Sequence, residues 1–431
     1  MSKIVKKMVP LALVIFIFCP KGIGIPELKE PTGGEQVSLP VTFIWTSVED
    51  ADHYTIEVDT ALEFSGPVIS TSTTDTTYTT SDLDTLKYYW RVASVDAEGN
   101  QGDFSDPDSF VVKGAAYPRN LIATIQLPAE DPVSIDITPD GSELWIAYWG
   151  QFDTTVTVIS TASNQITHEI PTTNPCHDLG EIRISANGNF VYFCGPWDMD
   201  SSGLIELSTS SYSQTRMIGY PYGSQQVPGG PDGPGIALTQ PNDYVYAVNM
   251  ANVDDGYITK IDLNAGTPID SIHMSWIADV DLNHAETKLY AVGEEDSLYE
   301  IDPANLTVTR QLGVGYAAHR LVITNDDQYA FVAGDSIYVV DLNSFTVVAR
   351  FDPDISAEGL KLTPDEHYLF ICDGGANYID VVDVSDPTNP QLIEKLSIPS
   401  AGSFSELVFN SDGSRAYVVE DNNPYLYVLG R

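Results

Sequence analysis

Residues 134–149 have the sequence SIDITPDGSELWIAYW, and this stretch decides the fold. It consists of an apolar strand, a tight polar turn and a second apolar strand, which is the pattern of a β-hairpin. The same pattern begins at residues 134, 181, 235, 279, 320, 359 and 406. Its mean spacing of about 45 residues is close to the length of a four-stranded propeller blade. The sequence therefore predicts an all-β fold that contains a seven-bladed β-propeller.

The two ends of the repeat region predict how the propeller closes. Most repeats continue with a third strand such as SIYVVDL and a fourth such as TVVARFD. The seventh repeat ends after three strands, whereas an additional strand, NLIATIQLP at residues 120–128, precedes the first repeat. Pairing of this strand with the end of the chain would leave no unpaired edge in the ring. We therefore expect a propeller over residues 115–431 that is closed by strand 120–128.

Residues 25–114 predict a separate all-β module. Apolar residues alternate with polar ones in VTFIW, at residues 41–45, and in HYTIEV, at residues 53–58. The later stretch YYWRVASVDAEGNQGDFS resembles a strand and its glycine-containing turn in fibronectin type III modules. The resemblance implies a β-sandwich in which Tyr88 or Tyr89 packs at the sheet corner, and such modules are usually spacers or binding surfaces.

The second strands of several repeats also resemble a known family. VYAVN, LYAVG and AYVVE, which end at Asn249, Gly293 and Glu420, are similar to the signature of YVTN-type β-propellers. DVVDVSDPTNPQLIEKL in the sixth repeat resembles LVIVD-type repeats. Relatives of this kind occur in surface-layer and other exported proteins and in some lactonase-like and redox enzymes. The resemblance therefore implies a fold and leaves the function open.

The first 24 residues have the pattern of a signal peptide. Lysines precede the apolar run LALVIFIFC, and Gly22 and Gly24 follow it at the spacing of a cleavage site. The run is shorter than the roughly 20 residues that a membrane-spanning helix needs. We therefore expect an exported protein, extracellular, at the cell surface or periplasmic, without a transmembrane span in the mature chain. A lipoprotein anchored through Cys19 is the less favoured alternative, because bulky Phe18 stands where lipid-attachment signals have a small residue.

The charge of the chain excludes two classes of partner. The sequence contains 61 acidic and 20 basic residues, and its formal net charge is −41. Nucleic acids and anionic membrane surfaces would be repelled by such a chain. Dispersed carboxylates are also common on proteins that must stay soluble, so the charge alone does not predict a cation site.

Ligands of β-propellers usually bind at the top face, which is formed by the loops from the fourth strand of one blade to the first strand of the next and by the loops between second and third strands. The repeat places these candidate residues at the top face: Trp149, His177, Asp178, Glu181, Trp197, Tyr222, Trp276, Asp279, His319, Arg320, Glu358 and Glu406. Aromatic rings beside carboxylates suit a carbohydrate or protein ligand. The alternative is that the rings pack between blades.

No cofactor is predicted from the cysteine and histidine pattern. Two top-face histidines are fewer than the ligands that a transition-metal site needs, and no haem-attachment motif occurs. Asp198 and Asp200 alternate as the ligands of calcium loops do, but an ordinary acidic turn is the stronger interpretation because the downstream glutamate is missing. Cys176 and Cys194 are expected at the same end of the second blade, where they could form a disulfide or stay reduced.

Binding and catalysis both remain open from the sequence, and binding is favoured. A binding or scaffold protein needs only the features described above. The alternative is a lactonase-like hydrolase, with or without a divalent cation, and it requires Glu181, Asp279, Glu358 and Glu406 to converge on one water molecule or metal ion. The G-x-S-x-G motif of serine hydrolases is absent from the sequence. We therefore expect a ligand platform more than an enzyme.

Overall fold

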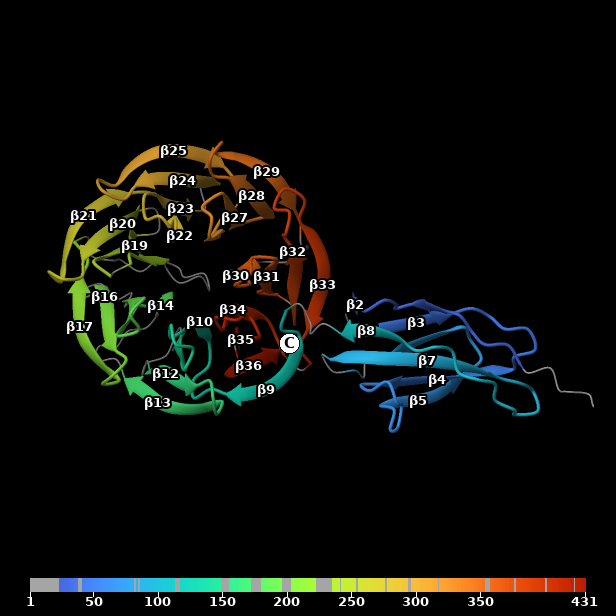
Figure 1. The fold of residues 1–431 in the computed structure, drawn as a ribbon. Coiled ribbons are helices and arrows are strands. Elements are labelled where there is room, and N and C mark those ends of the chain that lie inside the picture. Colours follow the sequence, from blue (N-terminus) through green and yellow to red (C-terminus); the bar gives the residue numbers. More distant parts are fainter. Residues whose placement is uncertain are drawn as a thin grey trace, which may run out of the picture. The chain divides into compact units, whose positions relative to one another are not determined.

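The computed structural model describes residues 23–37, 41–80, 83, 86–112, 117–148, 155–171, 180–195, 203–221, 235–240, 242–252, 255–275, 277–293, 296–316, 318–352, 357–375, 377–399, 401–421 and 423–431. Every regular element within these ranges is a β-strand. The chain divides into two compact units, Met1–Ala116 and Tyr117–Arg431 (Figure 1). Among the residues described, no helix is long and apolar enough to cross a membrane.

The first unit contains two sheets. One has the strand order β1 (Leu28–Glu30), β3 (Val41–Trp45) and β6 (Thr77–Thr80). The other has the order β2 (Glu35–Val37), β8 (Asp108–Val112), β7 (Lys87–Val95), β4 (His53–Asp59) and β5 (Ile69–Thr73). Inward residues of both sheets, including Phe43, Ile56 and Trp90, form one buried cluster. Tyr88 belongs to this cluster and stacks on Phe110, whereas Tyr89 is half-buried.

In the described part of the second unit, the strands form seven four-stranded antiparallel sheets. The first three are β10 (Pro132–Ile137), β11 (Glu143–Tyr148), β12 (Thr155–Ser160), β13 (Gln165–Pro171); β14 (Ile182–Ile184), β15 (Phe190–Gly195), β16 (Gly203–Ser208), β17 (Ser213–Gly219); and β18 (Ile236–Leu238), β19 (Tyr244–Asn252), β20 (Asp255–Asp262), β21 (Thr267–His273). The next two are β22 (Ile277–Leu282), β23 (Leu289–Gly293), β24 (Ser297–Asp302), β25 (Thr307–Gly313); and β26 (Arg320–Ile323), β27 (Tyr329–Ala333), β28 (Ile337–Asp341), β29 (Thr346–Phe351). The last two are β30 (Ala357–Leu362), β31 (Tyr368–Asp373), β32 (Tyr378–Asp383), β33 (Gln391–Ser397); and β34 (Phe404–Phe409), β35 (Arg415–Glu420), β36 (Tyr425–Gly430), β9 (Asn120–Gln126).

The seven sheets form a closed ring. Their first strands contact one another in the order β10, β14, β18, β22, β26, β30 and β34, and β34 contacts β10 again (Figure 1). The outermost strand of the last sheet is β9, which pairs with β36 from Gln126 opposite Tyr425 to Asn120 opposite Gly430. The last sheet therefore contains both ends of the unit.

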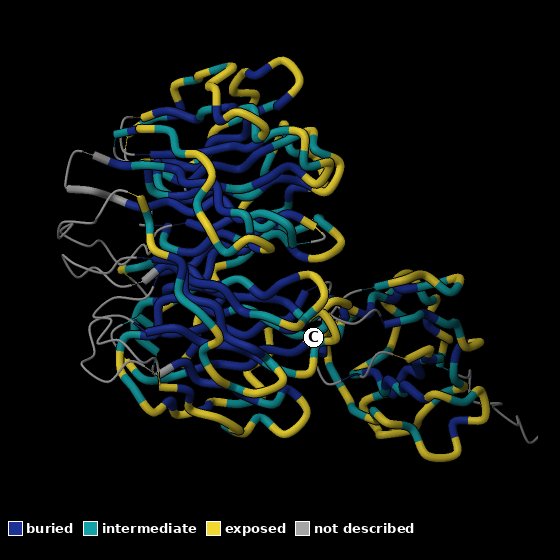
Figure 2. Tube along the Cα trace, turned by 90° about the vertical axis from the view of Figure 1, so that its left-hand side faces the viewer, coloured by how far each residue is buried: buried dark blue, intermediate teal, exposed yellow. Residues whose placement is uncertain are grey.

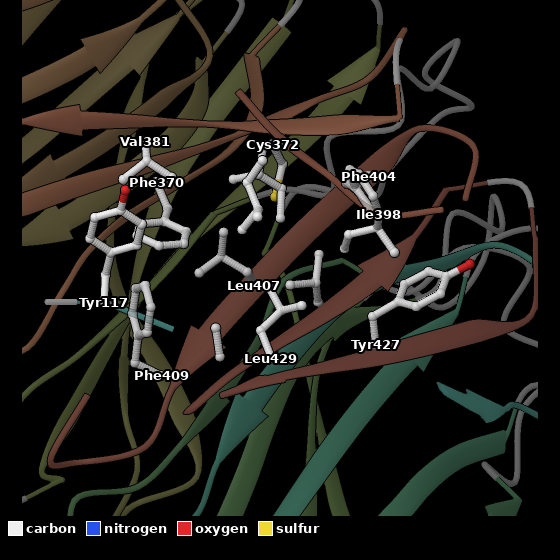
Figure 3. Packing of buried hydrophobic residues seen from close by; sticks show 14 residues of the cluster. Tyr117, Phe370, Cys372, Val381, Ile398, Phe404, Leu407, Phe409, Tyr427 and Leu429 are labelled. Atoms are coloured by element: carbon white, nitrogen blue, oxygen red, sulfur yellow. The ribbon is translucent and has the colours of Figure 1, made fainter. Parts of the chain in front are cut away.

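The hydrophobic core of the second unit lies between neighbouring sheets. One cluster joins Phe370 and Cys372 of β31 to Phe404 and Leu407 of β34, and Tyr117 packs at its border (Figure 3). Buried residues follow the middle of the strands, and exposed residues follow the turns (Figure 2). Each sheet has two faces to bury, so its stability depends on both neighbours in the ring.

The turn between the first and second strands has the same backbone conformation in all seven sheets. Its fourth residue has a positive φ in each case: Gly141, Gly188, Asn242, Glu286, Asp327, Glu366 and Gly413. The four residues that are not glycine each accept a hydrogen bond from a backbone N–H in the corresponding turn of the preceding sheet. These contacts between sheets offset the strain of the left-handed conformation.

The outermost strand of every sheet in the second unit carries an irregularity at the same place. Where the outermost strand pairs with the third strand, the register shifts once. In the sixth sheet, for example, the shift lies between Val381 and Val382 of β32, opposite outermost strand β33. Such bulges twist an edge strand and hinder pairing with further strands. The ring is therefore protected against association through its outer edges.

Candidate functional site

The inner edge of the ring carries charged residues at two equivalent positions of the first strands. The first position holds Ser134, Glu181, Gly235, Asp279, Arg320, Gly359 and Glu406. The second position, two residues later, holds Asp136, Arg183, Ala237, Asp281, Val322, Lys361 and Val408. Four of the residues predicted for the top face therefore belong to one set of charges around the centre of the ring: Glu181, Asp279, Arg320 and Glu406.

The carboxylates of this set accept hydrogen bonds from the backbone of the following sheet. Oε2 of Glu181 lies 2.9 Å from the backbone N of Ile236, and Oδ2 of Asp279 lies 3.0 Å from that of Leu321. Oδ2 of Asp136 accepts from the backbone N of Ile184 at 2.7 Å. The first strand of each sheet has unpaired N–H groups at the inner edge of the ring, and these side chains satisfy them. Their primary role in the structure is therefore to join neighbouring sheets.

Glu406 makes the corresponding connection through a serine. The Ser134 hydroxyl donates to Oε2 of Glu406 at 2.6 Å and accepts from the backbone N of Ile182 at 3.1 Å. This chain of contacts links the last sheet to the first and the first to the second. It closes the ring at the inner edge, opposite the closure that β9 makes at the outer edge.

Gly235 is required at its place because the third and fourth sheets approach closely there. A Cβ atom at Gly235 would lie 2.7 Å from both the Cα of Asp279 and the backbone N of Val280. The backbone N of Gly235 also donates to the carbonyl oxygen of Ala278 at 3.0 Å. The third sheet therefore has no side chain at this position, and a direct backbone hydrogen bond joins it to the fourth sheet.

Burial changes the protonation of the carboxyl groups. It raises the pKa of Glu181 to about 8, where Asp279 and Glu406 add repulsion and Arg183 and Arg320 oppose the shift. It also raises the pKa of Asp281 to about 6, against the attraction of Arg183. The pKa values of Asp279 and Asp136 are raised by burial as well. At neutral pH the set therefore holds fewer negative charges than its composition indicates.

This arrangement predicts that the protein loses stability as the pH rises from about 4.5 to about 8. The folded chain binds the Glu181 proton more tightly than the unfolded chain does, since the pKa rises from 4.5 to about 8 on folding. The stabilisation that this proton provides is therefore complete below pH 4.5. It is lost as the pH rises through about 8, the pKa of Glu181 in the folded chain. Denaturant unfolding at pH 5 and pH 8 should show a smaller difference for Glu181→Gln than for the wild type. The exposed Glu169→Gln variant should keep the wild-type difference.

The other predicted residues of the described part connect the fifth and sixth sheets. His319 Nε2 contacts the carbonyl oxygen of Ala357, and Arg320 Nε donates to the carbonyl oxygen of Glu358 at 3.0 Å. The convergence of Glu358 with Glu181, Asp279 and Glu406 on one point stays a prediction. Among the described residues no group of three or more His, Cys, Asp or Glu side chains is placed to hold a metal ion.

The remaining predicted residues lie outside the described part of the chain. They are Trp149, His177, Asp178, Trp197, Tyr222 and Trp276, together with the calcium candidates Asp198 and Asp200 and the cysteine Cys176. Cys194 is buried, and its Sγ accepts a hydrogen bond from the Tyr220 hydroxyl at 3.0 Å. The two alternatives for Cys194, a disulfide with Cys176 or a reduced thiol, stay as the sequence analysis left them.

The top face also presents an aromatic residue that was not predicted. Tyr316, in the loop between β25 and β26, is 72% exposed. Its carbonyl oxygen accepts a hydrogen bond from the backbone N of Asp335 at 2.8 Å, which fixes this loop to the one between β27 and β28. Gly315 has a φ of 84°, and a Cβ atom there would collide with Tyr338 and Asp335. The backbone of this loop is therefore held in place, and the Tyr316 side chain is exposed to solvent. The carboxylate of Asp335 accepts a hydrogen bond from the Tyr338 hydroxyl at 2.9 Å and pairs with Arg350.

The comparisons with known proteins bear on the fold. Residues 364–397 match the LVIVD repeat family. No curated protein matches the chain. A chain of Kuenenia stuttgartiensis hydrazine synthase is similar in structure, with 18% sequence identity and a TM-score of 0.58 over 71% of this chain and 97% of that one. A chain of a mitotic checkpoint complex is similar at 10% identity and a TM-score of 0.61, over 74% of this chain and 95% of that one. Together with the ring of four-stranded sheets, these similarities show a propeller-type fold.

Proposed function

We propose that this chain is an exported binding or scaffold protein, in which a seven-bladed β-propeller presents a ligand surface at its top face. A fibronectin type III-like module precedes the propeller as a spacer or second binding surface. Export rests on the lysine-rich and apolar pattern of the first 24 residues. The observation that carries the proposal is the use of the central carboxylates: Glu181 and Asp279 bond to backbone groups of the next sheet, and Glu406 bonds to Ser134.

The same contacts weigh against the lactonase-like alternative. A general base needs a carboxylate oxygen that can reach a substrate or a water molecule. Glu181, Asp279 and Glu406 instead hold the sheets together. One observation favours catalysis. With a pKa of about 8, Glu181 would be protonated at neutral pH and could itself act as a general acid. Hydrolysis of a panel of lactones and esters, with and without divalent cations, should be undetectable, and turnover lost in Glu181→Gln would establish the alternative.

Tyr316 is the described residue best placed to contact a ligand at the top face. An exposed aromatic ring that is rigidly held can stack on a sugar or an apolar side chain at low entropic cost. The neighbouring loop, which bonds to the Tyr316 backbone, carries the partly exposed Asp335 carboxylate, whose remaining lone pairs can accept hydrogen bonds from hydroxyl or amide groups. A carbohydrate or protein ligand fits this combination of an apolar face and a polar neighbour.

The Tyr316→Ala variant is expected to weaken ligand binding by about tenfold or more, as truncation of an aromatic anchor commonly does. Calorimetric titration of the protein with panels of glycans and extended peptides would identify the ligand and measure the change. The melting temperature should stay unchanged because Tyr316 is exposed. The matched control is Ile269→Ala, which removes an apolar side chain that is 51% exposed from outer strand β21. Equal affinities of the Tyr316→Ala variant and the wild type would contradict this role.

A further inference from the structure

Strand β5 is an unprotected edge of the first unit. It is the last strand in the order β2-β8-β7-β4-β5, and it pairs with β4 in regular register from Tyr54 opposite Thr73 to Val58 opposite Ile69. The stretch from Val68 to Thr74 contains no charged residue and no proline. Its backbone groups on the side away from β4 therefore form a regular template for a further strand.

The other edge strands of the molecule differ from β5. Each outer strand of the second unit carries a bulge. In the first unit, β1 and β2 are short and contain charged residues such as Lys29 and Glu35. Strand β6 is uncharged but shorter than β5. Since bulges and charges are the usual protection of a sheet edge, β5 is the edge at which pairing is least hindered.

We propose that β5 pairs with β5 of a second copy of this chain, antiparallel and across a twofold axis, so that the two five-stranded sheets become continuous. The sequence of the strand is self-complementary in this arrangement. With Ser72 on the axis, Thr71 faces Thr73 of the second copy and Ser70 faces Thr74. The central facing pairs then consist of two hydroxyl side chains, which is a favourable cross-strand combination, whereas Ile69 at the start of the strand faces Asp75, just beyond its end.

Two observations within the molecule support this pairing. A hydroxyl pair of the same kind joins β3 to β6, where Oγ1 of Thr42 and Oγ1 of Thr79 lie 3.0 Å apart. Val68, directly before β5, is 55% exposed and lies on the same face of the strand as Ser70 and Ser72. Pairing of β5 would bring a second copy beside this exposed apolar side chain.

The charge of the chain explains why this edge fits a second copy. Two molecules with a net charge of −41 repel each other, so a shared interface must not place carboxylates opposite one another. The uncharged run from Val68 to Thr74 meets this requirement. The distant charges still oppose association, and salt screens them. Association is therefore expected to strengthen as the ionic strength rises.

Sedimentation equilibrium of the full chain, over a range of protein and salt concentrations, tests the proposal. The expected result is a monomer–dimer equilibrium that Ser72→Lys weakens by about tenfold or more, since two lysines would face each other across the axis. Two control variants should leave the equilibrium unchanged: Ser213→Lys on bulged strand β17, and Thr77→Lys on β6. A monomer at every concentration, or a dimer that responds to Thr77→Lys and not to Ser72→Lys, would overturn the proposal.

A crosslinking experiment tests the register independently. A Ser72→Cys variant should form a disulfide-linked dimer under mild oxidation, because residue 72 faces its own copy across the axis. The Ser213→Cys variant measures the crosslinking that any exposed thiol gives, and the wild-type chain measures the crosslinking through its native cysteines. A dimer by sedimentation that Ser72→Cys does not crosslink above this background would show that a different surface holds the copies together, and the pairing of β5 would then be wrong.

Discussion

The Glu300→Ala variant is expected to lose about 2 kcal/mol of the free energy of unfolding, because it removes a buried carboxylate that bonds to one hydroxyl and to two partly exposed cations. Glu300 lies on β24, and its side chain is 2% exposed. It accepts hydrogen bonds from the Thr309 hydroxyl at 2.6 Å and from Nζ of Lys288 at 3.0 Å, and it is paired with Arg310. Arg310 in turn donates to the carbonyl oxygen of Leu342 in the next sheet at 2.8 Å. Denaturant unfolding of the full chain measures the loss.

Two matched variants sharpen this test. Glu206 has the same role in the second sheet, where Tyr192, Thr215 and Arg216 bond to it, so Glu206→Ala should lose a similar amount. Exposed Glu169→Ala should change stability by less than about 0.5 kcal/mol. Equal stability of all three variants would show that the network contributes nothing.

The effect of Glu300→Ala should disappear in acid. Burial favours the protonated form, but hydrogen bonds from Arg310, Thr309 and Lys288 outweigh it and lower the pKa of Glu300 to about 2. The pKa of Glu300 in the folded chain lies below its ordinary value of 4.5, so the ionised carboxylate stabilises the fold above pH 4.5. This stabilisation is lost as the pH falls through about 2. Wild type and variant should therefore converge in stability near pH 2.

The Gly235→Ala variant is expected to lower the free energy of unfolding by about 3 kcal/mol, which is the upper part of the range for overpacked sites. The new methyl group would meet backbone atoms of Asp279 and Val280, which cannot turn aside as a side chain can. The strain would separate the third and fourth sheets at the inner edge of the ring.

Gly313→Ala is the control for this substitution. Gly313 lies on β25, and the nearest atom to its added Cβ would be 3.8 Å away, an ordinary contact. Thermal unfolding should therefore leave Gly313→Ala close to the wild type and shift Gly235→Ala to a clearly lower temperature. If the two variants melted together, the close approach of the two sheets at Gly235 would not limit stability.

The internal repeat made much of the second unit predictable from the sequence. Hairpin turns such as TPDG define where strands begin and end, so the register of the repeat assigns equivalent positions to Glu181, Asp279 and Glu406. The structure confirms the all-β, propeller-type character of the chain. The second set of inner charges, such as Asp136 and Arg183, was missed, although period-2 alternation along the same strands could have found it.

Other features depend on distances between sheets and could not be predicted. Whether Glu181 serves catalysis or accepts a hydrogen bond from Ile236 is decided by how closely two sheets approach. The exposure of Tyr316 depends on the backbone at Gly315 and on the loop that holds it. Most aromatic residues of β proteins are buried, so no pattern in the residues around Tyr316 marked it as exposed.

The pairing of β9 with β36 has a consequence for the order of folding. Strand β9 is made first in the second unit and β36 last, so β9 has no partner until the whole unit has left the ribosome or, in an exported chain, the translocation channel. Contacts between such distant segments form slowly because a long loop must close. Until then the apolar residues Leu121 and Ile122 belong to an unpaired strand. A chaperone that covers this strand until the last sheet forms would therefore raise the yield of folded protein more than one that acts on any internal sheet.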